Sequence, residues 1–284
     1  MNAFQTGISR LLGWYAGSCP GHRGKWRLVE TMVSLFGLQS GYSAPVKALR
    51  RHRWFELDLN GHIERKIYYQ EAHEIWDTVY IESVVQPDWV VMDIGANIGW
   101  YSLMASKKVG PTGKIFSFEI SPDEMNKLRR NVALNQLTNI EPLLLAIADQ
   151  PGRVFITDTR SAGTTSLAAS AGEARHEIEA TSLDHFVDER KLQRIDLIKC
   201  DIEGAEVKFL TGAHASLARF KPILMIELNP SALERFGNRL EEVTGPLTQL
   251  GYTLHQVGRD GLSPLTRLPT GRDFINVVAL PPRS

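Results

Sequence analysis

The chain has 284 residues, of which 43% are hydrophobic and 23% charged, a composition typical of a folded globular protein with a sizeable core. Its 32 Lys and Arg balance its 32 Asp and Glu, so it lacks the net positive charge that favours nucleic-acid partners. Cys19 and Cys200 are too few for a disulfide framework or a thiolate zinc site, and no apolar run is long enough to cross a bilayer. We therefore expect a cytoplasmic protein with no integral membrane segment.

The first part of the chain, residues 1–86, is predicted to be an N-terminal extension of helices and a hairpin. Apolar residues spaced three and four apart between Leu11 and Phe36 predict amphipathic helices. These helices could pack as a cap on the rest of the protein, which we favour, or lie on a membrane surface. From Trp54 to Tyr69, two alternating runs flank Asn60-Gly61, which predicts a β-hairpin. Residues 71–85 are predicted to form a helix.

The remaining part, residues 87–284, alternates predicted strands with predicted helices. Apolar, β-branched strands alternating with helices predict an α/β fold with a mostly parallel sheet covered on both faces. The strands are expected at residues 90–94, 114–119, 140–147, 153–157, 196–200, 223–228, 252–257 and 274–280. The helices between them are expected at 100–108, 122–135, 205–217 and 240–250. Residues 161–172 are small and polar, which predicts a loop near the carboxyl edge of the sheet.

The stretch DIGANIGWYS, residues 93–102, follows the first of these strands with an acid, glycines and an asparagine. A dinucleotide-binding turn has a middle glycine where Asn97 stands, and Asp93 would repel a diphosphate. The same acid would attract an amino-acid ammonium group. Glu119, at the end of the next strand, could accept hydrogen bonds from ribose hydroxyls. A nucleoside with a cationic amino-acid tail and no phosphate matches both acids, and S-adenosylmethionine is such a molecule.

These motifs together resemble the FkbM-type class I methyltransferases. The similar segments are DIGANIGWYS, FSFEISP, NVALN, SLDHF, IDLIKCDIEGAE and IEL, in that order, within residues 67–280. The resemblance implies a Rossmann-like, seven-stranded fold and S-adenosylmethionine as cofactor. It also implies cofactor-binding roles for Asp93, Gly95, Ala96, Asn97, Gly99, Glu119, Ala148 and Asp149. Alone, the glycines could merely permit a tight turn, and Glu119 could cap a helix.

A second acidic cluster, Asp201, Glu203 and Glu206, follows the strand at 196–200. The resemblance implies that Asp201 and Glu203 face the transferred methyl group, whereas Glu206 more simply stabilises a helix N-terminus. Either acid could take a proton from an acceptor hydroxyl. Alternatively, Asp201 could bind Mg²⁺ or Mn²⁺ together with Glu227 and Asn229, and the sequence does not choose between these roles.

The segment that follows the same strand also bears on the acceptor. Amino methyltransferases of nucleobases carry a proline-proline-aromatic run there, and the run of residues 200–204, CDIEG, lacks it. We therefore predict an O-methyltransferase acting on a hydroxyl of a small molecule or glycan, of the sugar or polyketide type. The alternatives are a nucleotide-dependent oxidoreductase and a catalytically silent S-adenosylmethionine-binding module. His185 and His255 are weaker candidates for a base. The sequence does not define the oligomeric state.

Overall fold

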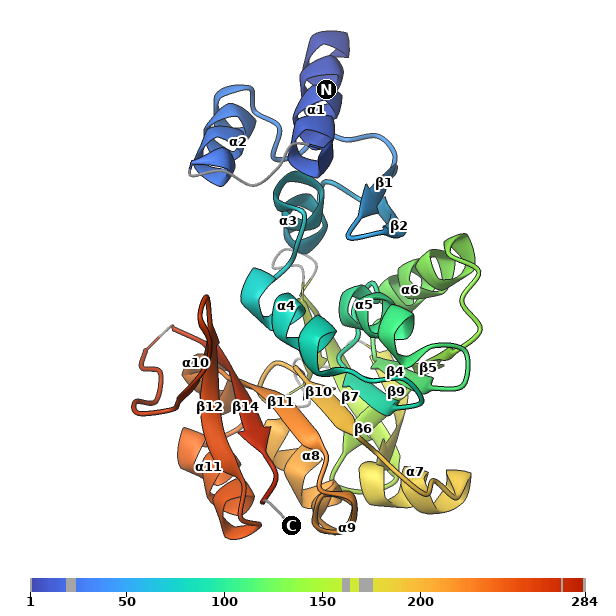
Figure 1. Ribbon diagram of the computed structural model, residues 1–284, viewed down its shortest axis with the longest axis vertical. Coiled ribbons are helices and arrows are strands. Elements are labelled where there is room, and N and C mark those ends of the chain that lie inside the picture. The colour runs from blue at the N-terminus through green and yellow to red at the C-terminus, as the bar shows by residue number, and fades with distance from the viewer. Residues whose placement is uncertain (1, 19–23, 160–163, 169–175, 272, 283–284) are drawn as a thin grey trace.

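The computed structural model describes residues 2–18, 24–159, 164–168, 176–271 and 273–282. Its central sheet has the strand order β13-β12-β14-β11-β10-β3-β4-β5 (Figure 1). The five strands from β11 to β5 are parallel, and β12, β13 and β14 run antiparallel to their neighbours. The strands are β3 (Val90–Ile94), β4 (Lys114–Glu119), β5 (Ile140–Leu144), β10 (Leu197–Cys200), β11 (Ile223–Leu228), β12 (Thr253–Gly258), β13 (Gly261–Pro264) and β14 (Ile275–Leu280).

Seven of these strands were predicted, and the short edge strand β13 is an addition. The residues of β13 are mostly exposed and lack apolar alternation, so the sequence held no strand signal there. If β13 is left out and the other seven strands of this sheet are numbered along the chain, their order across the sheet is 6-7-5-4-1-2-3. The seventh strand is antiparallel to its neighbours. This is an α/β, Rossmann-like sheet of the predicted kind.

Helices cover both faces of the sheet. Successive residues of each central strand point to opposite faces, and both sets are apolar, so each face must be covered. One face packs beneath α4 (Ile75–Val84), α5 (Trp100–Val109) and α6 (Pro122–Leu134), and the other beneath α7 (Leu183–Arg190), α8 (Glu206–Gly212), α9 (His214–Phe220) and α11 (Leu240–Gln249). A short helix, α10 (Pro230–Glu234), follows β11. The first face is built on Val91, Ile115 and Leu197, and the second on their neighbours Met92, Phe116 and Ile198.

A second, four-stranded sheet has the order β6-β9-β7-β8. It consists of β6 (Ala146–Ala148), β7 (Gly152–Thr159), β8 (Thr164–Leu167) and β9 (His176–Ser182). The single strand expected at residues 140–147 is therefore divided, because the chain leaves the central sheet after Leu144 and pairs with β9 instead. Of the loop expected at residues 161–172, the structure describes residues 164–168, and residues 164–167 form β8.

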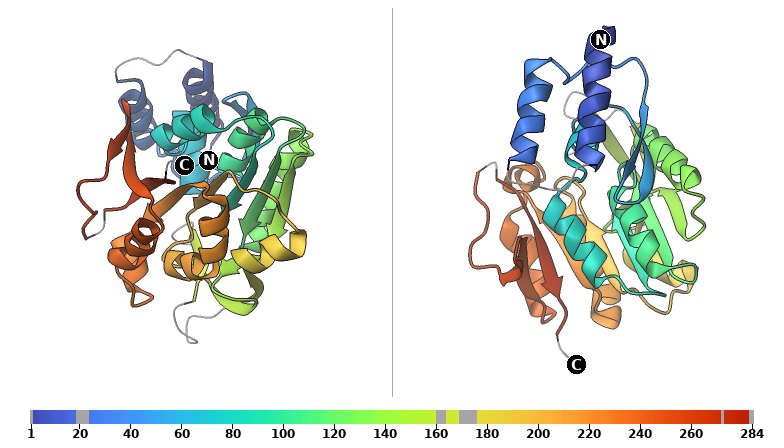
Figure 2. Two further views of the ribbon diagram at one scale, coloured as in Figure 1. Left: turned by 60° about the horizontal axis from the view of Figure 1, so that its bottom comes forward. Right: turned by 45° about the horizontal axis from the view of Figure 1, so that its top comes forward.

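The N-terminal part lies at the end of the molecule opposite the C-terminus (Figures 1 and 2). The helices α1 (Ala3–Ser18) and α2 (Lys25–Leu35) both pack against α3 (His62–Gln70). Phe55 then stacks near Trp100 of α5, with ring centroids 5.1 Å apart. Residues of this part and of the central sheet thus belong to one apolar cluster. No helix in the described part of the chain is long and apolar enough to cross a membrane.

The hairpin of this part is formed by β1 (Val46–Arg50) and β2 (Arg53–Leu57), not by the segments on either side of Asn60-Gly61. Its two-residue turn, Arg51-His52, has φ angles of 47° and 65°, which the sequence did not signal because Asn-Gly is the usual pair there. The segment after Gly61 is the helix α3, whose Ile63 and Ile67 are spaced by one helical turn. Asn60 instead bonds the backbone of residues 41 and 42.

Candidate active site

The turn between β3 and α5 forms one wall of a pocket at the carboxyl edge of the sheet. Gly95, Asn97 and Gly99 all have positive φ angles, of 81°, 51° and 89°. A Cβ atom on Gly95 would overlap the backbone carbonyl oxygen of Asp201, so only glycine fits there. The N–H groups of Gly95 and Ala96 donate to the carbonyl oxygen of Phe118, each at 2.9 Å. The turn is therefore fixed against the end of β4.

Glu119, the last residue of β4, holds the same turn from the other side. Its Oε2 accepts the Asn97 N–H at 2.7 Å, and its Oε1 accepts the N–H groups of Ile120 and Ser121 at 2.8 and 2.7 Å. Burial, opposed by these N–H groups, raises the pKa of Glu119 to about 7. A carboxylate offers about four acceptor positions, so one on Oε2 remains for a ligand.

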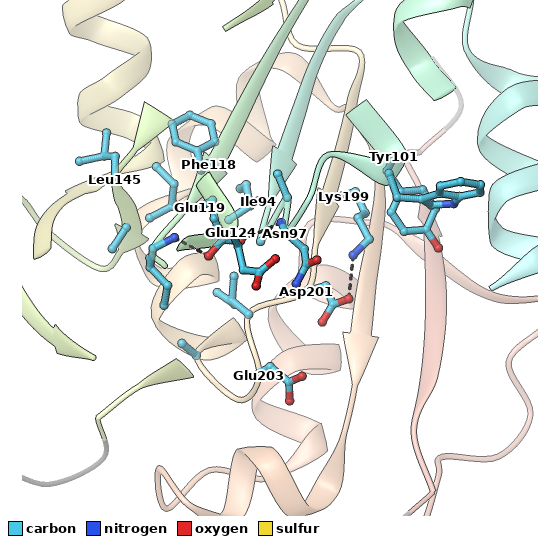
Figure 3. Close-up of a pocket in the computed structure, with 18 of the residues that line it drawn as sticks. Ile94, Asn97, Tyr101, Phe118, Glu119, Glu124, Leu145, Lys199, Asp201 and Glu203 are labelled. Atoms are coloured by element: carbon cyan, nitrogen blue, oxygen red, sulfur yellow. Dashed lines mark hydrogen bonds and ion pairs between the residues drawn. The ribbon is translucent and has the colours of Figure 1, made fainter. Parts of the chain in front are cut away.

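The pocket is partly open to solvent, and the space between its lining atoms is about 920 Å³ when the solvent at its mouth is included. Among the predicted cofactor-binding residues, Gly95, Ala96, Asn97 and Glu119 line it (Figure 3). Beside Glu119 the wall is apolar, which suits a flat nucleobase. That part of the wall comprises Phe118, Ile120, Leu145, Ala146, Ile147 and Leu167.

Asp93 and Gly99 lie behind the pocket wall. Asp93 is only 1% exposed, and its Oδ2 accepts the hydroxyl of Ser102, which also contacts the hydroxyl of Ser117 at 2.6 Å. Burial raises the pKa of Asp93, whose Oδ1 has no hydrogen-bond partner among the described residues. Gly99 precedes α5 and packs against the side chain of Leu128. Both residues support the turn from the side that faces away from the pocket. Their direct contact with a cofactor stays a prediction.

Ala148 and Asp149, which were expected near the adenine, follow the division of the predicted strand. Ala148 ends β6 in the second sheet, and its carbonyl oxygen lies close to Gly212 of α8. Neither residue is among those that line the pocket. Residues 145–147 occupy the corresponding place, because the chain turns out of the central sheet after Leu144.

The second acidic cluster meets the pocket at the end of β10. Asp201 and Glu203 line it, and Lys199 donates to Oδ2 of Asp201 at 2.8 Å (Figure 3). The Lys199 side chain is 3% exposed and that of Asp201 is 22% exposed. Although burial opposes it, the carboxylates around Lys199, led by Asp201, raise its pKa above the ordinary value, so Lys199 is charged. Burial, followed by the charge of Asp201, raises the pKa of Glu203.

Glu206 braces the turn that carries this cluster. Its Oε1 accepts the N–H groups of Ile202 and Gly204, each at 3.2 Å, and burial raises its pKa to about 7. As expected, this acid lies at the N-terminus of a helix, α8.

The residues expected to bind a divalent cation do not form a suitable site. Among the described residues, no group of three or more His, Cys, Asp and Glu is placed to hold a metal ion. An ammonium group already occupies Asp201, and Oδ1 of Asn229 accepts the N–H of Ala232 at 3.2 Å at the start of α10. Burial, followed by nearby carboxylates, raises the pKa of Glu227 to about 10, so its carboxyl is neutral at pH 7. The expected cation therefore finds no support.

Besides Glu124, four polar residues at the site were missed in the sequence: His73, Glu74, Tyr101 and Lys199. His73, Tyr101 and Lys199 line the pocket, and the hydroxyl of Tyr101 donates to Glu74 at 2.6 Å. Lys199 lies 4.8 Å from the centre of the Tyr101 ring. A lysine inside the apolar strand LIKC was a usable signal, since a buried charge must be paired. The other three belong to helices or their termini, where no spacing distinguishes them.

The strand order, the glycine-containing turn after β3 and the acid at the end of β4 are those of the Rossmann-like fold of class I S-adenosylmethionine-dependent methyltransferases. A sequence model described as the methyltransferase FkbM domain matches residues 93–254, more than half of the chain. The chain therefore belongs to the family of the methyltransferase FkbM domain.

Several individual proteins are also similar to this chain. Methyltransferase sdnD of Sordaria araneosa is 28% identical over 182 residues, covering 53% of this chain and 69% of that protein. The 2-O-methyltransferase NoeI of Sinorhizobium fredii is 26% identical over 151 residues, covering 47% and 61%. The solved structure of methyltransferase FkbM from Methylobacillus flagellatus is 16% identical with a TM-score of 0.45, covering 97% of this chain and 59% of that one. The aligned part of the chain spans between 10% and 69% of the length of the curated relatives that it matches.

The pocket suits S-adenosylmethionine on its own geometry. The turn at residues 95–97 can support the amino-acid part, the free acceptor position of Glu119 can take a ribose hydroxyl, and the apolar wall can hold the adenine. The bound cofactor supplies an electrophilic methyl group.

Proposed function

We propose that this protein is an S-adenosylmethionine-dependent methyltransferase that transfers the methyl group to a hydroxyl oxygen of a small molecule or glycan, of the sugar or polyketide type. The observation that carries the proposal is the polar wall at the end of β10. Where nucleobase amino methyltransferases have a proline-proline-aromatic run, Asp201 and Glu203 line the pocket. Charged side chains can bind a hydroxylated acceptor through hydrogen bonds, and they offer no aromatic surface on which a base would stack.

In this proposal Gly95, Ala96, Asn97 and Glu119 hold the cofactor, with Asp93 and Gly99 supporting the turn. Asp201 and Glu203 face the acceptor beside the transferred methyl group. Methyl transfer requires an in-line approach of the acceptor oxygen, so orientation by fixed polar groups accelerates it. The Lys199 ammonium keeps Asp201 in one orientation.

Relatives favour the same acceptor chemistry, since one similar protein is named as a 2-O-methyltransferase. The N-terminal part contributes Ile63 and His73 to the pocket, so it would help to shape the acceptor side. The alternative of another class, a nucleotide-dependent oxidoreductase, does not agree with membership of a methyltransferase family.

A panel assay tests the proposal. The full chain is incubated with S-adenosylmethionine and separate methyl glycosides, uronides and hydroxylated macrolactones, and products are analysed by mass spectrometry. We expect at least one hydroxylated compound to gain a single methyl group on oxygen. Methylation confined to amine or thiol analogues of the same compounds would reject the proposal.

A further inference from the structure

The helix α1 has a second apolar side in addition to the one that packs against α3. Its buried side includes Leu12 and Ala16. On the opposite side, Phe4, Leu11 and Trp14 are 67%, 62% and 62% exposed, and we call these three residues the outer stripe of α1. A helix that is apolar on all sides is normally covered on all sides. The outer stripe is therefore expected to have a partner.

The members of the outer stripe lie on the same side of the helix. Their separations of seven and three positions correspond to whole helical turns. Gly7 lies between Phe4 and Leu11, and no described atom lies within 4 Å of a Cβ added there, so this side of α1 is open. Phe4 meets Phe36 edge to face, with ring centroids 6.1 Å apart, and the adjacent Leu35 is 70% exposed. The apolar surface thus continues at the end of α2.

The part of the chain that carries the outer stripe is positively charged. Residues 1–55 hold eight Lys and Arg but a single acidic residue, Glu30, whereas residues 56–284 hold 24 basic and 31 acidic residues. The only charged residue within α1 is Arg10, which is exposed, as are Arg27 and Lys47. The balanced charge of the whole chain therefore combines a basic N-terminal stretch with an acidic remainder.

An anionic lipid surface matches both the apolar stripe and the charge. Its acyl chains accept apolar side chains, and its phosphate groups attract Lys and Arg. A second copy of this chain would instead bring two basic N-terminal stretches together, which their like charges oppose. The helices α1 and α2 form the end of the molecule opposite the C-terminus (Figures 1 and 2). Binding there leaves the carboxyl edge of the central sheet to the cofactor.

We propose that the outer stripe of α1 binds this protein to the surface of an anionic lipid bilayer. Phe4, Leu11 and Trp14 enter the region of the headgroups and the upper acyl chains, and Arg10 contacts lipid phosphate. Tryptophan suits this interface because its ring is apolar and its indole N–H donates a hydrogen bond. The inner side of α1 covers α3 while its outer side faces lipid, so both roles expected for these helices are filled. The inference does not rest on the proposed function.

Flotation of the full chain with lipid vesicles tests the proposal. We expect binding to vesicles of phosphatidylcholine and phosphatidylglycerol, weaker binding to phosphatidylcholine alone, and release at high salt. Leu11→Gln and Trp14→Gln should each weaken binding to the mixed vesicles roughly tenfold, because each removes a large apolar side chain from the interface. Phe155→Gln is the matched control, since Phe155 is 52% exposed on β7 of the second sheet. The thermal unfolding midpoint of each variant shows that its fold is intact.

Two further readouts test the charge and the position of the contact. Arg10→Glu should weaken binding to the mixed vesicles roughly tenfold, whereas Arg219→Glu, exposed on α9, should bind as the wild type. The tryptophan fluorescence of the wild type should shift to shorter wavelength on the mixed vesicles. Trp14→Phe should keep the binding, because phenylalanine is also apolar, but should lose this shift.

Several results would overturn the inference while leaving the hydroxyl acceptor untouched, since the panel assay decides that separately. They are the absence of binding to the mixed vesicles, equally tight binding to phosphatidylcholine alone, and unchanged binding in folded Leu11→Gln and Trp14→Gln. A fluorescence shift that persists in Trp14→Phe would place the contact elsewhere. A wild type that does not bind vesicles but is dimeric in sedimentation, and becomes monomeric in Leu11→Gln, would assign the outer stripe to a second copy.

Discussion

Replacing Glu119 with alanine should weaken S-adenosylmethionine binding without unfolding the protein. Three of its roughly four acceptor positions bind backbone N–H groups, which leaves one for a ribose hydroxyl. Losing one charge-assisted hydrogen bond costs about 1.5 to 3 kcal/mol, so the dissociation constant should rise roughly 10- to 150-fold. Isothermal titration calorimetry measures this change directly. Glu124→Ala is the matched control, because Glu124 lines the same wall but pairs with Lys127 at 3.0 Å.

The pH dependence of binding gives a second check on the same residue. The pKa of Glu119 is about 7, so it loses its charge as the pH falls through 7 and the wild-type affinity should decline there. Glu119→Gln should remove that decline, since it does not titrate. Unchanged affinity in folded Glu119→Ala, or an equal loss in Glu124→Ala, would show that Glu119 does not hold the ribose.

Three further predictions concern the turn, the acidic cluster and stability. Gly95→Ala should abolish cofactor binding because its Cβ would overlap a backbone carbonyl. In contrast, Gly110→Ala, which has a positive φ but no atom within 4 Å of the added Cβ among the described residues, should cost only about 1 to 3 kcal/mol of unfolding free energy in urea denaturation. Asp201→Asn should keep cofactor affinity but lower turnover about 10²-fold, and EDTA should leave wild-type turnover unchanged because Lys199 occupies the carboxylate; full activity of the variant would contradict this. Glu227 has a pKa of about 10 against an ordinary 4.5, so the stability it contributes is complete below pH 4.5 and is lost as the pH rises through 10; Glu227→Gln should flatten that loss in urea titrations at pH 7 to 10.

The sequence predicted the central sheet well, because its strands are buried on both faces and read as apolar runs followed by glycine or acidic residues. It also predicted that Gly95, Asn97 and Glu119 would lie together, since parallel strands end at one edge of a sheet. The strand expected at residues 153–157 is present as β7, but β8, β9 and the edge strand β13 were missed, and the existence of a second sheet was not predicted because its pairing is non-local. The Asn60-Gly61 hairpin was wrong because a strong local turn signal was overridden by the helical spacing of Ile63 and Ile67.

The acceptor side was predictable only in part. The acids after β10 follow from strand position, but the ion pair between Lys199 and Asp201 depends on how a side chain within the strand turns toward its end. His73 lines the pocket from the connection between α3 and α4, and nothing in its local sequence encodes that placement. Residues brought in by tertiary packing of the N-terminal part are therefore where sequence reasoning failed.

The central claim is that the methyl group is transferred to oxygen, and the chemical shift of the transferred methyl carbon tests it most directly. The wild-type chain would be supplied with S-adenosylmethionine carrying a ¹³C-labelled methyl group and with the hydroxylated panel compounds, each beside its amine analogue. The account predicts a new ¹³C resonance in the range of a methyl ether, absent from Gly95→Ala. A labelled methyl resonance in the range of an N-methyl or S-methyl group, with no methyl ether formed, would contradict it.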